Sequence, residues 1–467
     1  MNQQKKLLMN IAAGVLLFAL ALLLPGSLFS YEARLAVGTI VLMVFWWVTR
    51  PVHIAVTALL PIVVNALFRM APMADVLKDY FSEIAVLLIG AHIIIACFIG
   101  SGLDKRLALR ALTLIGTSIK RQIVIWLSLA TLMSAFLPNA VVAATLCPIA
   151  ASMLRFSLGE DEQGSSQSGY LVQLAIVWGA GLGGFGTPLG GAMNLIAIKF
   201  IESYTGTEYM YITWTLKMLP YLLALFLGTC IYLLSIRTER TRLSGSRAFF
   251  QEEYQKLGQM SRSEIISLVL FVLSVLLAFA RPLYEGILPE LKPYFVFLIL
   301  GVLAFFLPGG NGRRLVSWEL ASKHMNWGLI LLFSGGLAAG NLILSTGAAD
   351  AVAQAVQKLQ LHSPQLLLIL FLTLGIFLAN TSSNTAAVAV LIPVVIGVAS
   401  GLKLDPLPFV YAASAACNAA FALPTSIRAI PVGYGLDIRF MFKKGMAAAG
   451  ISLAVLLLTA LAMTVLV

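Results

Sequence analysis

Two apolar arms in the second half of the chain, Leu366–Phe377 and Ala386–Val398, are separated by a short run of small and polar residues. Each arm is shorter than the roughly 20 residues that cross the hydrocarbon core of a bilayer as a helix. Two half-length arms around a polar tip are typical of a re-entrant hairpin, because non-helical backbone at membrane depth survives only inside protein or beside a wet cavity. An ordinary turn between two helices is the alternative, and this stretch alone does not decide between them.

A weaker copy of the same pattern lies in the first half of the chain. The arms Ile123–Phe136 and Val141–Leu154 meet at a tip that contains Asn139, just as the second tip contains Asn384. In both halves a proline stands nine residues beyond the asparagine of the tip. The repetition favours the hairpin interpretation for both stretches.

An interrupted apolar segment follows each hairpin. The first, 170–202, contains a glycine-rich run with Pro188, and so many glycines together with a proline cannot hold a straight helix. We predict a helix broken near the membrane centre, and the alternative is a glycine-rich packing face against another helix. The second segment, 407–440, is interrupted between Leu423 and Pro431.

Paired, interrupted segments in two similar halves are the sequence signature of a secondary transporter built from inverted repeats. The predicted units are an N-terminal helix at 1–35, a first repeat at 36–236 with a hairpin at 121–155 and a broken helix at 170–202, a basic cytoplasmic linker at 237–264, and a second repeat at 265–467 with a hairpin at 366–400 and a broken helix at 407–440. The predicted fold class is an all-α polytopic membrane protein with about 11 transmembrane helices.

Composition and charge agree with a membrane protein. Of the 467 residues, 60% are hydrophobic and 11% are charged, so a soluble domain could not solvate this surface. The net charge is +11, and the basic residues lie in short loops between apolar segments. This distribution fits the positive-inside rule with a cytoplasmic N-terminus in a plasma (inner) membrane, rather than a nucleic-acid-binding surface. The four cysteines have no metal-ligand spacing.

The polar tips offer the chemistry of an anion site. A half-helix that begins at a tip points unpaired N–H groups and the positive end of its dipole at whatever lies before it. Ser383, Asn384 and Thr385 add two hydroxyls and an amide, whereas Asn139 is flanked by Pro138 and Ala140, which donate no side-chain hydrogen bond. Two such ends that face each other would hold a small dianion, and oxygens of the loops could hold Na⁺.

Arg428 is the most informative charged residue. It lies beside Thr425 and Ser426 in the second interrupted segment, among apolar residues. A charge at membrane depth is costly and indicates function, and a guanidinium suits a carboxylate or sulfate. The alternatives are that Arg428 extends to an interface or pairs with an acid such as Asp437.

These motifs together resemble the divalent anion/sodium symporter family, which contains SLC13-type di- and tricarboxylate and sulfate carriers. The resemblance rests on the tip Ser383-Asn384-Thr385 and on the glycine-rich run from Gly183 to Asn194, and it extends from about residue 36 to the end of the chain. It implies a homodimeric, elevator-type carrier that holds a dianion between two sodium sites. No organic cofactor is implied, and Na⁺ is the one candidate ion.

The resemblance carries site roles onto individual residues. The residues expected at the substrate are Asn139, Ala140, Gly191, Ser383, Asn384, Thr385, Thr425, Ser426 and Arg428. The candidate sodium ligands are Ser134, Asn139, Gly186, Gly190 and Asn384. The first tip lacks the usual serine and threonine, and the second interrupted segment has Arg428 within a shortened motif. We therefore hypothesise that Arg428 supplies a fixed positive charge where the family binds Na⁺, which would favour exchange or atypical sodium coupling.

The predicted function is secondary transport of a small divalent anion, with a C4 dicarboxylate as the leading candidate. The alternative is a sodium-coupled carrier of sulfate or another inorganic anion. The predicted partners are the anionic substrate, the lipid membrane and a second copy of the chain, without nucleic acid. Four scattered histidines and the lack of an acidic pair at a fixed spacing predict no enzyme. A channel would need charge rings along a pore, whereas hairpins from opposite faces favour alternating access.

Overall fold

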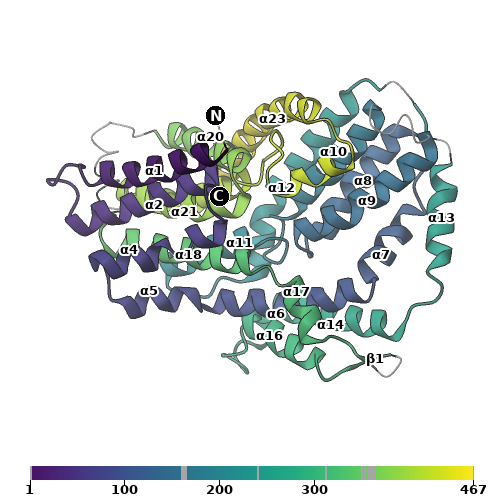
Figure 1. Ribbon diagram of the computed structural model, residues 1–467, viewed down its shortest axis with the longest axis horizontal. Coiled ribbons are helices and arrows are strands. Elements are labelled where there is room, and N and C mark those ends of the chain that lie inside the picture. The colour runs from purple at the N-terminus through teal and green to yellow at the C-terminus, as the bar shows by residue number, and fades with distance from the viewer. Residues whose placement is uncertain are drawn as a thin grey trace.

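The chain forms helices almost throughout, as the computed structural model shows (Figure 1). The structure describes residues 3–158, 166–238, 241–243, 245–310, 313–348 and 363–465, together with residues 351 and 354. Within these ranges the only strands are a short antiparallel pair, β1 (Pro308–Gly310) and β2 (Arg313–Arg314). The all-α fold class that the sequence predicts is therefore confirmed.

The first half of the chain contains the helices up to the charged linker. They are α1 (Gln3–Ala21), α2 (Tyr31–Thr49), α3 (Ile54–Thr57), α4 (Leu60–Phe68), α5 (Met73–Tyr80), α6 (Glu83–Gly100), α7 (Leu103–Leu112), α8 (Ile119–Ser134), α9 (Asn139–Leu158), α10 (Gln167–Gly183), α11 (Ala192–Thr205) and α12 (Tyr211–Ser235). Figure 1 shows α8 and α9 toward the end of the molecule opposite α1 and α2.

The second half repeats much of this element order. Its helices are α13 (Ser246–Lys256), α14 (Arg262–Phe279), α15 (Arg281–Tyr284), α16 (Pro293–Ala304), α17 (Trp318–His324), α18 (Trp327–Ser345), α20 (Pro364–Thr381), α21 (Asn384–Gly401), α22 (Leu407–Ala416), the 3₁₀ turns η1 (Ser426–Ala429) and η2 (Pro431–Tyr434), and α23 (Ile438–Val465). The inverted orientation of the two repeats and their boundaries stay predictions.

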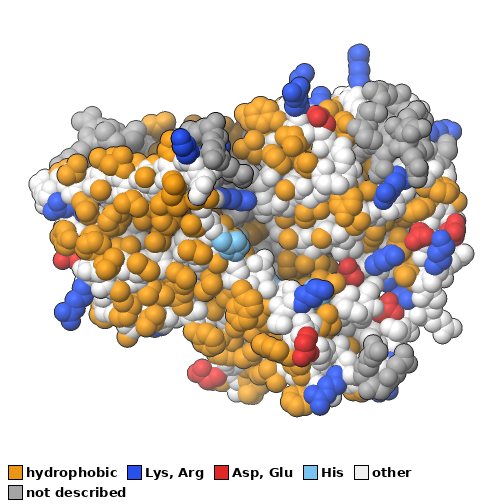
Figure 2. All heavy atoms as spheres, in the orientation of Figure 1, with side chains coloured by type: hydrophobic (Ala, Val, Ile, Leu, Met, Phe, Trp, Pro, Cys, Tyr) orange, Lys and Arg blue, Asp and Glu red, His pale blue; other side chains and the backbone are white. Residues whose placement is uncertain are grey.

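Ten helices in the described part of the chain are long and apolar enough to cross a membrane. Three shorter apolar helical segments accompany them: Ile54–Phe68, Pro293–Ala304 and Leu407–Ala416. This count differs from the predicted count of about 11 because the two include different helices: α9, α20 and α21, which are arms of the predicted hairpins, are among the ten, whereas the short apolar segments are not. Figure 2 shows apolar side chains covering the surface over α1, α2, α4 and α5, with many charged side chains toward the opposite end.

The two predicted hairpins are the helix pairs α8/α9 and α20/α21. Asn139 and Asn384 are the first residues of α9 and α21, so both tips end where a helix begins. The arms of the second pair are longer than the apolar pattern indicates, at 18 residues each, because Asn380 and Thr381 are helical and α21 continues to Gly401. That both pairs return to the side of the membrane they left stays a prediction.

The glycine-rich run combines both interpretations of its sequence. Helix α10 ends at Gly183 and α11 begins at Ala192, so the segment is broken as predicted. Gly183 also lies directly against α8, where a Cβ atom would overlap the carbonyl group of Thr131. The same glycines therefore allow close packing on α8 and end the helix.

The second interrupted segment departs from the expected pair of half-helices. After α22 the chain is irregular as far as Thr425, and it then forms the 3₁₀ turns η1 and η2 instead of a second α-helix. Ser426 has a φ of 53°, in the left-handed region that non-glycine residues seldom adopt. This turn directs the chain so that Arg428 is buried.

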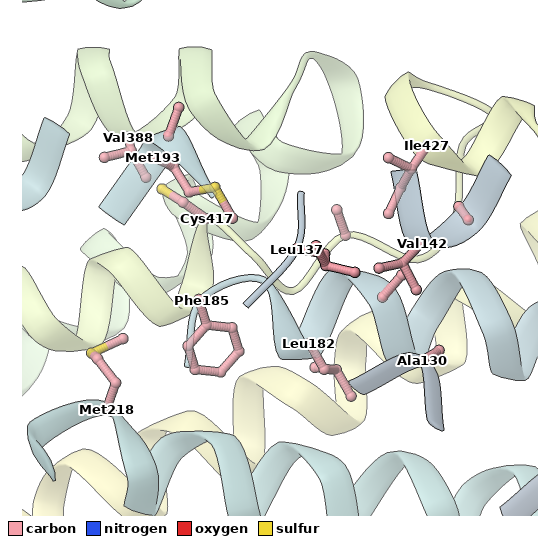
Figure 3. Close-up of a cluster of buried hydrophobic side chains, with 14 of the residues drawn as sticks. Ala130, Leu137, Val142, Leu182, Phe185, Met193, Met218, Val388, Cys417 and Ile427 are labelled. Carbon is pink, nitrogen blue, oxygen red and sulfur yellow. The ribbon is translucent and has the colours of Figure 1, made fainter. Parts of the chain in front are cut away.

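Buried apolar side chains join the first tip to both interrupted segments (Figure 3). Leu137 of the tip, Leu182 and Phe185 of the first break, and Ile427 of η1 belong to one hydrophobic cluster. Phe185 and Leu182 are fully enclosed. Since protein interiors are close-packed, the cluster fixes the relative positions of these segments.

The charged linker contains a folded helix rather than a loose loop. Residues 239, 240 and 244 lie outside the described residues, and α13 follows them. Phe250 of α13 packs on Trp126 of α8, with ring centroids 5.9 Å apart. Arg106 of α7 donates to both carboxylate oxygens of Glu264, at 2.6 and 3.2 Å, and to the backbone carbonyls of residues 257–259. The linker thereby connects α7, α8 and the start of α14.

Candidate functional site

The two tips line one cavity of about 300 Å³. Pro138, Asn139 and Ala140 contribute from the first tip, and Ser383, Asn384 and Thr385 contribute from the second. Gly191 and Ser426, from the two interrupted segments, lie in the same wall. The structure therefore brings together residues that are far apart in the sequence. Their role in binding is a prediction that the geometry alone does not test.

The first tip presents the beginning of a helix to the cavity. Asn139 is half-buried and starts α9, and Ala140 is exposed to the cavity. The side chain of Ser134 is not free, because its hydroxyl donates to the carbonyl oxygen of Ala180 at 2.7 Å. At this tip the polar character comes from the Asn139 amide and from backbone N–H groups of the first turn of α9.

The first interrupted segment is held against this tip by hydrogen bonds. Asn194 donates to the carbonyl oxygens of Gly184 and Thr187, at 2.7 and 2.6 Å, and the hydroxyl of Thr187 donates to the carbonyl of Ala135. A Cβ atom on Gly190 would lie 2.5 Å from the carbonyl oxygen of Ser134 and 2.7 Å from that of Gly184. Only glycine permits so close an approach.

This arrangement places two of the five predicted sodium ligands together. Ser134 and Gly190 are neighbours, and the side-chain oxygen Oδ1 of Asn194 is buried without a hydrogen-bond partner. Neutral carbonyl and amide oxygens are ligands that suit Na⁺ in broken-helix carriers. Gly186 differs from Gly190 in its nearest neighbour, because a Cβ atom at Gly186 would meet the side chain of Leu222 instead of the Ser134 carbonyl oxygen. Within the described residues no cluster of three His, Cys, Asp or Glu side chains could hold another metal.

The second tip is polar and well ordered by its own hydrogen bonds. The Ser383 hydroxyl oxygen accepts from the backbone N–H of Ala386 at 3.2 Å and so caps α21. The Asn384 amide donates to Oδ1 of Asn418 at 3.0 Å, and Asn418 donates in turn to the carbonyl of Ser414. The Oδ1 atom of Asn384 and the hydroxyl of Ser414 are buried without hydrogen-bond partners among the described residues.

Arg428 is buried behind this tip, with 2% of its surface exposed. Its guanidinium donates to the carbonyl oxygens of Leu423, Ala420 and Ala379, at 2.9, 3.2 and 3.1 Å, and to the hydroxyl of Thr425. We name these four acceptors the oxygen cage. It joins α20 to the irregular segment after α22.

The oxygen cage decides between the interpretations of Arg428 that the sequence leaves open. Extension to a membrane interface is wrong, because the side chain is enclosed. The pairing with Asp437 is also wrong, since among the described residues Arg428 forms no ion pair and Asp437 accepts instead from the backbone N–H of Phe440. Arg428 and Thr425 do not line the cavity either, whereas Ser426 does. Any effect of Arg428 on a bound anion therefore acts through the loop and through its charge.

The described cavity wall contains no Asp, Glu, Lys or Arg side chain. Its positive character comes instead from the first turns of α9, α11 and α21, each of which begins at the cavity. The opposite wall is formed by α6 and by the region where α17 meets α18. This wall contributes His92 and His324, which are the titratable groups of the described lining.

Sequence reasoning did not identify several polar residues around the site. The sequence favours a structural role for His92, and it indicates no particular role for Asn380, whose Oδ1 accepts from the backbone N–H groups of Phe421 and Ala422 at 3.0 and 2.9 Å. Asn418 was likewise not singled out. A polar residue inside an apolar helix was the available signal in each case, but only the fold shows which element it faces.

Comparison with known proteins gives the family. The family model for the citrate transporter (CitMHS) matches residues 44–416. A sodium-dependent dicarboxylate transporter, SdcS, from Staphylococcus saprophyticus is 26% identical over 97% of this chain and 90% of its own length. SdcS from Staphylococcus aureus strain RF122 is 27% identical over 94% of this chain and 87% of its own length. These matches confirm the resemblance to the divalent anion/sodium symporters, and the chain belongs to the citrate transporter family, a family of membrane transporters and not of enzymes.

Proposed function

We propose that this chain is a secondary carrier of a small dianion, in the first place a C4 dicarboxylate. The single observation that carries the proposal is the shared cavity, in which two helix-starting tips face one space without any charged side chain in the described wall. Helix N-termini attract anions, each with about 0.3–1 kcal/mol and up to about 2 kcal/mol in partly buried sites. The names of the relatives, which are sodium-dependent dicarboxylate transporters, support this substrate class.

The proposed mechanism is alternating access by an elevator movement in a homodimer. The repeated order of a long apolar helix, a helix pair and an interrupted segment supports it, because such repeats place the binding site at their interface. In this proposal the tips and the interrupted segments move together as one rigid unit with the bound anion. The protein lies in the plasma (inner) membrane, with its N-terminus in the cytoplasm.

The proposed coupling assigns different roles to the two halves of the site. Oxygens around Ser134, Gly190 and Asn194 provide a place for one Na⁺, whereas Arg428 supplies a permanent cation in the oxygen cage of the second half. A guanidinium is part of the protein and cannot leave with the cargo. When the carrier returns without an anion, the positive charge of Arg428 crosses the membrane without a compensating negative charge, which is unfavourable. Return with a second anion is therefore favoured, and sodium dependence is weaker than in a carrier with two sodium ions.

Counterflow in proteoliposomes tests the transport function and its coupling separately. Vesicles with the purified protein and internal succinate should accumulate external radiolabelled succinate, and should do so with sodium replaced by choline at a reduced but measurable rate. Failure to accumulate any dicarboxylate under either condition would contradict the carrier function. Uptake that needs sodium absolutely, yet proceeds without internal anion, would contradict the exchange mechanism while leaving the carrier function intact.

A further inference from the structure

The walls of the cavity differ in hydrogen-bonding character. The wall formed by the tips is rich in donors, because it contains the first turns of α9 and α21, the Ser383 and Thr385 hydroxyls and the Asn139 amide. The facing wall on α6 is apolar except for His92, and its other lining residues are Leu87, Leu88, Ala91, Ile95 and Ile99. A bound dianion would therefore meet donors from the tips and two imidazoles from the rest of the lining, His92 on α6 and His324 at the end of α17.

The tautomer of His92 follows from its contact with the backbone. Its Nδ1 atom lies 2.6 Å from the carbonyl oxygen of Leu88, one turn earlier in α6. A carbonyl oxygen can only accept, so Nδ1 carries the hydrogen, and in the neutral ring Nε2 is left as an acceptor. Nε2 has no hydrogen-bond partner among the described residues. The side chain is 7% exposed and lines the cavity, so the cavity is where a partner for Nε2 can come from.

The same surroundings favour the neutral form of His92. No acidic side chain belongs to the described wall of this cavity, so the protein supplies no counter-charge for an imidazolium there. Enclosure in an apolar wall disfavours the charged ring further. A neutral Nε2 lone pair repels a carboxylate oxygen but binds a hydroxyl or an undissociated carboxyl, both of which donate.

We propose that His92 is a specificity-determining residue whose Nε2 accepts a hydrogen bond from a donor group on the cargo, so that the cavity prefers hydroxylated carboxylates to unsubstituted ones. The inference rests on the proposed function. It specifies the substrate class as hydroxy di- or tricarboxylates, whose carboxylates face the tips while the hydroxyl faces α6. A cargo without such a donor leaves Nε2 desolvated and unpaired, which costs binding free energy.

Competition binding in detergent or nanodiscs tests this preference with matched ligands. Malate and 2-methylsuccinate differ by a hydroxyl in place of a methyl group, and at about pH 8 the carboxyl groups of both are dissociated. We expect the protein to bind malate about tenfold more tightly, which corresponds to one good hydrogen bond. In His92→Phe the preference should fall to about onefold, whereas His92→Gln, which retains an acceptor oxygen, should preserve part of it.

The outcomes separate the inference from the function on which it rests. Equal affinity for malate and 2-methylsuccinate in the unaltered protein, or an unchanged preference in His92→Phe, overturns the role of His92 but leaves the carrier function standing. Lack of binding of either ligand at any pH contradicts the proposed dicarboxylate substrate and overturns the inference with it. A preference that exists only at acidic pH assigns the donor to an undissociated carboxyl instead of the hydroxyl. His53→Asn, at an exposed helix cap outside the described cavity wall, is the matched histidine control and should bind like the unaltered protein.

Discussion

Replacement of Arg428 by alanine should make the stability of this protein depend on sodium. The change removes the guanidinium from the oxygen cage and leaves three carbonyl oxygens and the Thr425 hydroxyl without their donor. With about 1 kcal/mol for each hydrogen bond, the loss is roughly 4 kcal/mol in a medium without a suitable cation. A small cation that enters the vacated cage would compensate for part of this loss.

The size of that compensation follows from linkage. A ligand that binds only the folded state adds about 2.7 kcal/mol when its concentration is 100 times its dissociation constant. Thermal unfolding of the purified Arg428→Ala variant should therefore occur at a clearly higher temperature in sodium chloride than in choline chloride of equal ionic strength. The unaltered protein should show a smaller sodium response, because the guanidinium of Arg428 already occupies its oxygen cage. Equal ionic strength in both media removes general screening from the comparison.

Two further variants serve as controls for this experiment. Arg428→Lys keeps a cation near the cage and should gain little sodium dependence. Arg34→Ala removes an arginine that donates to the backbone carbonyl of Leu22, far from the cavity, and should leave the sodium response unchanged. The reasoning is refuted when Arg428→Ala is as stable as the unaltered protein in choline, or when sodium stabilises both to the same extent.

Other substitutions test the parts that hold the site together. Ser383→Ala removes the cap of α21, and it should lower the free energy of unfolding by about 1 kcal/mol and weaken anion binding in ligand competition. Ser363→Ala removes a comparable cap at the start of α20, and it should lower the stability without changing anion binding. Gly190→Ala places a methyl group 2.5 Å from the Ser134 carbonyl oxygen and should reduce sodium-stimulated uptake, and normal sodium stimulation in this variant would contradict the close approach. Arg106→Ala leaves the carboxylate of Glu264 buried without a partner and should destabilise the protein by about 3–5 kcal/mol in thermal unfolding, more than Glu264→Gln.

Polarity along the chain was sufficient to predict both tips and the first break. The apolar arms around Asn139 and Asn384 are long enough to be recognised, and the asparagines do begin helices that line one cavity. The glycines between α10 and α11 were also informative, because their backbone freedom and close packing are local properties. In these cases the structural effect depends on the residues of the segment itself: apolar runs form helices, and clustered glycines allow a helix to end and to pack closely.

The surroundings of Arg428 could not be predicted in the same way. Its partners are backbone carbonyls, which every residue possesses, so no side-chain pattern indicates them. The left-handed conformation of Ser426, at the start of η1, depends on tertiary packing, because a serine does not indicate a positive φ as a glycine would. The proposed role of His92 could not be predicted for a related reason, since the residues that share its cavity come from segments distant in sequence.

The folded linker is attached to two parts of the molecule. Arg106 holds α7 to the segment before α14, while Phe250 keeps α13 seated on α8. A movement of α8 and α9 relative to α14 would either move α13 and α7 with them or break one of these contacts. If the proposed elevator movement occurs, the linker therefore limits how far the first helix pair can move relative to α14 while these contacts hold.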